Sequence, residues 1–233
     1  MSFLRHLRIS AASLLLCALI ASPPPVRAQD ASGELNLPGL QNDAANFQSS
    51  LSQPFPAGVP AARLKQAEDA AAQALAAKDY TKALPALQVI AAAAERQNAT
   101  PDWHLWLAIA EAKLTSKPPR PQQALQAGWL AFTTIDQKSP TAAADQVASL
   151  TLMRAAAASL QQPVPEVQIL AAIARRLPKD DPAQAELRQR RQALGLVFNS
   201  LATDAESFPA RACLSFLGDP STSPDFHPGD WIT

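Results

Sequence analysis

The sequence predicts a mainly α-helical protein in which antiparallel helix hairpins stack on one another, followed by a short, incomplete β segment. Ala and Leu dominate residues 61–194, where apolar residues recur at the spacing of amphipathic helices. The chain has 21 prolines against 7 glycines, which favours helices interrupted by rigid turns over strands joined by flexible hairpins. Each apolar stripe is too narrow to be buried by its own helix, so the helices must pack against one another.

Residues 1–28 have the features of a cleaved signal peptide. Arg5 and Arg8 precede an apolar run over residues 9–21, and Val26 and Ala28 supply small residues at the positions that a signal peptidase reads. The run is shorter than the roughly 20 residues that a membrane-spanning helix needs. We therefore expect cleavage after Ala28, export to the periplasm and no membrane span in the mature chain. The alternative is that the leader remains as an inner-membrane anchor.

Cleavage changes the charge and the thiol content of the chain. The leader holds three of the 20 basic residues and no acid, so 17 bases face 20 acids in the mature chain. A net charge of about −3 disfavours nucleic acid as a partner. The leader also removes Cys17, so Cys213 is the only remaining thiol and no intrachain disulfide is possible. Cys213 is interpreted as a small apolar strand residue or as half of an intermolecular bridge.

Residues 29–60 predict a flexible leader to the first helix. Gly, Pro, Ser and Asn are frequent there and no helical or strand period is sustained. The alternative is a short recognition segment that uses Leu35, Leu37 and Leu40.

Seven helices are expected in a helical-repeat domain over residues 61–195. Proline is placed at the first position of several of them, where its missing N–H costs nothing. These prolines are Pro101, Pro121, Pro140, Pro165 and Pro182. The second helix follows Asp79 and Tyr80, and Pro85 implies that it begins nearer Ala83 or is kinked. Pro163 is expected to stop the fifth helix, and Gly195 to end the seventh.

A weak internal repeat supports stacked hairpins. Residues 83–91 align with residues 124–132, and each stretch falls in the second helix of a pair. Residues 78–84 resemble the turn and second-helix start of a tetratricopeptide repeat, although Lys78 stands where such repeats usually carry Gly. A generic α-hairpin is the alternative.

Residues 196–233 predict the start of a β domain. Residues 196–201 and 211–217 are expected to form short strands, because apolar residues alternate in the second of them. Two strands alone are marginal in water, so the sheet is interpreted as incomplete.

The stretch from Phe208 to Phe216, with the later run from Asp225 to Ile232, resembles the opening of the first macroglobulin-like domain in bacterial alpha-2-macroglobulin family proteins. Members with such a leader also carry Ala-rich, tetratricopeptide-like helices before that domain. The resemblance implies a periplasmic protease inhibitor that is much longer than this chain, and hence a truncated or split reading frame here. Many members use a Cys-x-Glu-Gln thioester. Cys213 is followed by Leu-Ser-Phe, so it does not match that motif.

No catalytic constellation is present in the sequence, so we expect neither an enzyme nor a metal or cofactor site. His104 and His227 lack metal-ligand spacing, and Asp180 and Asp181 are explained by helix capping. Trp103, Trp106 and Trp129 are interpreted as core residues. Arg188, Arg190 and Arg191 form the one basic cluster in the mature chain, either as a solvated helix face or as a docking patch for an acidic protein partner.

Two functions follow from these features. The first is a non-catalytic N-terminal scaffold of a periplasmic alpha-2-macroglobulin-like inhibitor, in which the complete family protein, and not this chain alone, inhibits proteases. The second is a stand-alone exported tetratricopeptide-like module that binds a protein partner.

Overall fold

The computed structural model describes residues 35, 37, 39–97 and 101–202 of the 233-residue chain. These residues contain eight α-helices and no strand. The helices are α2 (Leu40–Ser52), α3 (Ala61–Ala76), α4 (Tyr80–Arg96), α5 (Trp103–Thr115), α6 (Pro121–Thr134), α7 (Ala142–Ser159), α8 (Pro163–Arg176) and α9 (Ala183–Ala202).

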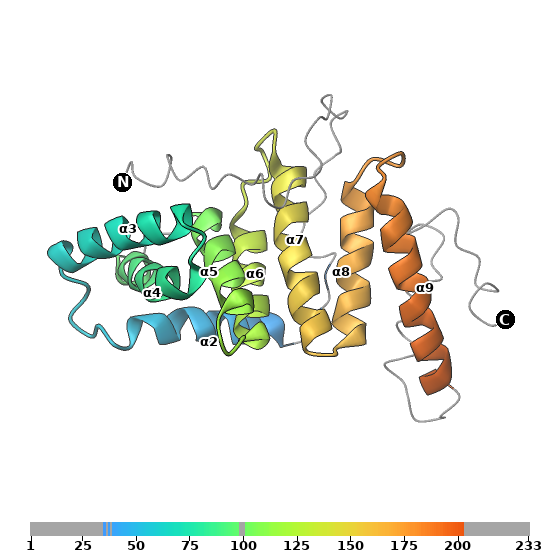
Figure 1. Ribbon diagram of the computed structural model, residues 1–233, viewed down its shortest axis with the longest axis horizontal. Coiled ribbons are helices and arrows are strands. Elements are labelled where there is room, and N and C mark those ends of the chain that lie inside the picture. The colour runs from blue at the N-terminus through green and yellow to red at the C-terminus, as the bar shows by residue number, and fades with distance from the viewer. Residues whose placement is uncertain (1–34, 36, 38, 98–100, 203–233) are drawn as a thin grey trace.

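Helices α3 to α9 form a row in which each helix packs on the one before it. Figure 1 shows α7, α8 and α9 standing side by side in alternating directions, joined by short turns. The prediction of a mainly helical, stacked array is therefore confirmed. The seven expected helices between residues 61 and 195 correspond to α3 to α9.

The core of the array consists of small residues beside large ones. Trp106 and Phe132 are almost fully buried, and Trp129 is also buried, whereas Trp103 is only partly covered. Gly128 of α6 lies against α7, where an added Cβ would come within 2.6 Å of the Met153 Cγ. In the same contact, the Ser149 hydroxyl donates to the Gly128 carbonyl at 2.8 Å. Close helix approach at Gly128 therefore sets the α6–α7 packing.

Helix α4 begins where the tetratricopeptide-like turn was expected. The Asp79 carboxylate accepts from the Lys82 backbone N–H at 3.1 Å and so caps the helix. Lys78 has a φ of 54°, in the left-handed region that favours glycine. Pro85 lies inside α4, so the predicted later start near Ala83 is wrong.

The proline positions only partly mark the helix starts. Helices α6 and α8 begin at Pro121 and Pro163, so Pro163 opens a helix that Pro165 was expected to open. Helices α5, α7 and α9 begin one or two residues after their prolines. A proline fixes its own φ near the helical value and keeps the residue before it extended, so it can stand just before a helix as well as inside the first turn.

The prediction that all of residues 29–60 form a flexible leader is wrong, because α2 occupies residues 40–52. Its apolar stripe is buried and consists of Leu40, Ala44, Phe47 and Leu51. The spacing of four, three and four residues places all four side chains on one face.

The boundary predicted at Gly195 is also wrong. Helix α9 continues to Ala202, so residues 196–201 are helical and do not form the first expected strand. The second expected strand at residues 211–217 and the macroglobulin-like runs lie outside the described residues, as do Ala28, Cys213 and His227.

Candidate protein-docking site

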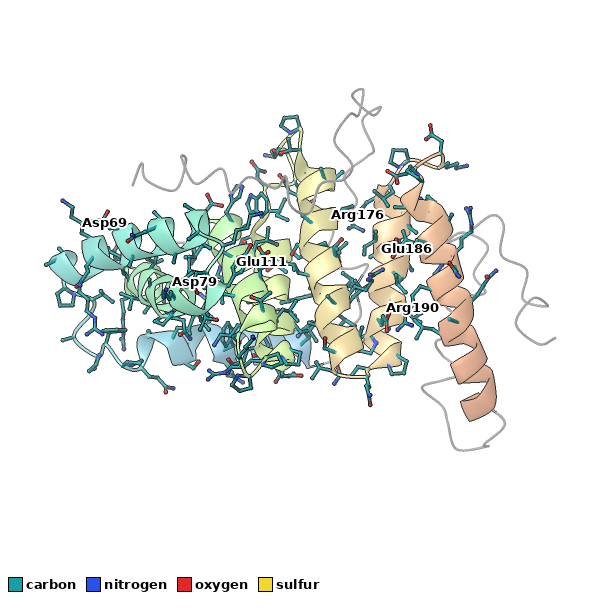
Figure 2. The ribbon with its side chains drawn as sticks, in the orientation of Figure 1. Asp69, Asp79, Glu111, Arg176, Glu186 and Arg190 are labelled. Atoms are coloured by element: carbon teal, nitrogen blue, oxygen red, sulfur yellow. The ribbon has the colours of Figure 1, made fainter. Side chains whose placement is uncertain are left out.

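The structure places the three arginines of the predicted docking patch in different environments. Arg188 is exposed, whereas Arg191 is 7% exposed and burial lowers the pKa of its guanidinium. Arg190 donates to both carboxylate oxygens of Glu166 on α8, at 2.6 and 2.9 Å. Figure 2 shows Arg190 on α9. Because Arg190 already has a partner and Arg191 is covered, the three do not form one continuous basic surface.

The Glu166–Arg190 pair fixes how α9 lies on α8. The Glu166 side chain is 4% exposed, while that of Arg190 is 45% exposed. A bidentate guanidinium–carboxylate pair restricts both distance and orientation between the two helices. This part of the predicted cluster is therefore structural.

A different surface, formed by α4 and α6 and here called the seat of α2, binds helix α2. Helix α2 packs across α4 and α6, the second helices of two successive hairpins. In Figure 1 it runs beneath the first hairpins of the row, far in sequence from α6. At the edge of the seat, Gln48 hydrogen-bonds to Glu95, and an Arg96 Nη2 donates weakly to the Ser52 carbonyl at 3.4 Å.

Lys113 of α5 lies under α2 and is 1% exposed. Its ammonium donates to the Gln123 side-chain oxygen at 2.7 Å and stands 5.8 Å from the centre of the Phe47 ring. No ion pair of Lys113 occurs among the described residues. Burial, and next the charge of Arg120, lowers the pKa of Lys113 to about 8. A buried ammonium with a lowered pKa can form an ion pair with a carboxylate, or it can lose its proton near neutral pH.

The position of Lys113 follows from helical periodicity. It lies four residues after Ile109 and seven after Trp106, which are both buried. That spacing puts all three on the core face of α5. Lys113 was not among the sequence-predicted site residues, although a lysine in register with the apolar residues of α5 indicates a buried lysine.

A second polar cluster joins the start of α5 to the start of α7. The Asp102 carboxylate caps α5 by accepting from the His104 backbone N–H at 3.0 Å, and it lies 2.7 Å from His104 Nδ1. The His104 ring stacks on Trp103. Burial raises the pKa of Asp145, while a hydrogen bond from Thr141 and the charge of His104 oppose that rise. These contacts satisfy backbone groups at the start of α5, and the described hydrogen bonds join the imidazole to the Asp102 carboxylate and not to a hydroxyl.

Within the described residues, no group of three or more His, Cys, Asp or Glu side chains could hold a metal ion. None of the helices in this part of the chain combines the length and apolar character needed to cross a bilayer.

Comparison with protein-family models, curated proteins and solved structures found no match to this chain.

Proposed function

We propose that this protein is a non-catalytic, exported helical scaffold that binds segments of other proteins. One observation carries the proposal: the array holds the amphipathic helix α2 across two of its hairpins, through a stripe of four apolar side chains. Laying an amphipathic helix along a groove between helices is a common mode of protein recognition. The array therefore has a surface of the shape and chemistry that such recognition uses.

Site-specific photo-crosslinking in the exporting cell tests this function. A photoreactive amino acid would replace, one at a time, exposed residues along the array: Lys65, Arg96, Arg120 and Arg188. A protein-binding scaffold should give discrete adducts, identified by mass spectrometry, at some positions and not at others. Absence of any adduct at all four positions, with helicity preserved by circular dichroism, contradicts the proposal.

A finer form of the proposal makes the array the N-terminal arm of an alpha-2-macroglobulin-like inhibitor. Its support is the sequence resemblance that begins at Phe208, with only five residues between it and the end of α9 at Ala202. In this form the array positions the β domains that follow. An open frame for further β domains in the DNA immediately downstream would support it, and an unrelated gene would support a stand-alone module.

Two proteins, residues 29–202 and residues 29–233, test whether the array is self-sufficient. The boundary at residue 202 keeps α9 intact. Equal helicity and equal unfolding midpoints are expected, because the buried core of the described residues runs from Leu35 to Leu194, before that point. Loss of folding in the shorter protein would show that the array depends on the residues that follow.

A further inference from the structure

We infer that the face of α4 and α6 under α2 is an exchangeable groove for an acidic amphipathic helix of another protein, and that α2 occupies it in the free chain. The inference rests on the proposed protein-binding function and names the site and the partner chemistry. Four observations, on the stripe, the charge, the rim and the tether, lead to it.

The apolar stripe of α2 is buried in the groove. Leu40, Ala44, Phe47 and Leu51 are all less than a tenth exposed and face α4 and α6. Any helix with apolar residues at the same spacing could bury them in the same place. Shape and apolar burial alone therefore do not restrict the groove to α2.

The charge of the groove is not matched by α2. Helix α2 carries one acidic residue, Asp43, which is exposed beside the stripe, three residues after Leu40 and four before Phe47, and makes no ion pair among the described residues. Above Lys113 it places the Phe47 ring, which can make only a cation–π contact. A buried ammonium is stabilised far more by a carboxylate with good geometry than by a ring at this distance. A glutamate in the place of Phe47 would supply that carboxylate.

The basic residues at the rim of the groove also favour an acidic partner. Arg96 is exposed, and its described hydrogen bond to α2 is the long one to the Ser52 carbonyl at 3.4 Å. Arg120 is also exposed and lies near enough to Lys113 to lower its pKa. Glu95 lies at the same edge, and its carboxylate accepts a hydrogen bond from Gln48 of α2. Complementary charge favours an acidic helix in both encounter and bound state.

The tether of α2 allows exchange. Residues 53–60 join α2 to α3, and their described hydrogen bonds are local, such as the one from the Gly58 N–H to the Phe55 carbonyl. Phe55 and Val59 are partly buried against the core, and Arg63 stacks over Phe55. The N-cap residue of α2 is Gly39, which makes no side-chain cap. Leaving the groove would break few polar contacts, so a partner competes mainly with apolar burial and with the tether's effective concentration.

The test uses three fluorescent peptides of residues 39–53: the native sequence, one with Phe47→Glu, and one with Phe47→Gln as the uncharged control. Binding is measured by anisotropy to the exported chain carrying Leu51→Asp, which weakens the chain's own α2 without altering the groove. The Phe47→Glu peptide should bind about ten-fold more tightly than the Phe47→Gln peptide. Adding Lys113→Met to the chain should abolish that difference.

Equal binding of the Glu and Gln peptides, or a preference that survives Lys113→Met, overturns the inference. Failure of every peptide to bind overturns it too, provided that hydrogen exchange shows α2 released and α7 still protected. If Leu51→Asp unfolds the array, the unmodified chain is used, and excess Phe47→Glu peptide should accelerate amide exchange in α2 several-fold more than the Gln peptide does. The absence of acceleration is then the contrary result. Photo-crosslinks at other positions would leave the broader scaffold function standing in each of these cases.

Discussion

Replacing Lys113 by Met should stabilise the protein, because the lysine is charged and buried without a carboxylate partner. The pKa of Lys113 is about 8, against 10.5 for a lysine side chain in water. A pKa difference of one corresponds to about 1.36 kcal/mol, so a difference of about 2.5 sets the upper limit for the cost of the charge at roughly 3–4 kcal/mol at neutral pH. Loss of the Gln123 hydrogen bond and of the Phe47 contact offsets part of this gain. A net stabilisation of about 1–2 kcal/mol at pH 7 is expected.

The lowered pKa of Lys113 also determines how the stability of the protein depends on pH. Below pH 8 the lysine is protonated in both the folded and the unfolded states, so the whole penalty is present. Between pH 8 and pH 10.5 the folded protein binds fewer protons than the unfolded chain, so the stability of the unmodified protein rises with pH. The advantage of Lys113→Met should therefore shrink across this interval.

Urea unfolding followed by circular dichroism, at pH 7 and at pH 10, measures both effects. Lys65→Met in α3 is the matched control, because Lys65 is an exposed helical lysine, and its effect should be small and independent of pH. A Lys113→Met protein that is less stable at pH 7, or whose advantage is the same at both pH values, would refute the account of a buried, unpaired ammonium.

Three further substitutions probe the array. Lys78→Gly should stabilise the protein by about 0.5–1 kcal/mol in thermal unfolding, because residue 78 has a left-handed backbone that strains a side chain, and a loss of stability would argue against strain there. Gly128→Val should destabilise by about 1–3 kcal/mol, since its side chain would collide with Met153, and an unchanged midpoint would mean that α7 can move away. Glu166→Gln should cost about 1 kcal/mol and increase amide exchange in α9, which a purely surface interaction with Arg190 would not do.

The helical array could be predicted because its signals are local and redundant. Helices α3 to α8 each carry several buried apolar residues at helical spacing, and α9 carries Leu187 and Leu194, so an error in one position does not change the assignment. The first residue of each helix was harder to predict. A proline before the cap and a proline inside the first turn look alike in the sequence, and the side-chain cap at Asp102, not Pro101, fixes the start of α5.

Short apolar runs were where the predictions failed. Helix α2 has only four apolar positions in its stripe, separated by Gln, Asn, Asp and Ser, and its helicity depends on burial against α4 and α6. Residues 196–201 contain enough β-branched and aromatic side chains for a strand, but α9 carries the helical conformation through them. In both cases the surrounding structure decides a conformation that local propensity leaves open.

The docking predictions depended on side-chain direction. Arg188 and Arg190 are two residues apart, so on a helix they point about 200° from each other. That geometry alone excludes one basic face made of all three arginines. The placement of Lys113 over Gln123 and under Phe47 required the tertiary contact between α2, α5 and α6, which no single segment of the sequence encodes.

The position of α2 across two hairpins makes the two ends of the row unequal. Because α2 contacts both α4 and α6, it couples the first two hairpins, which should unfold together. Among the described helices no comparable brace spans α7, α8 and α9, where stability passes only from one neighbour to the next. Under force or on heating, unfolding should therefore begin at α9 and proceed along the row, and the end that α2 braces should unfold last.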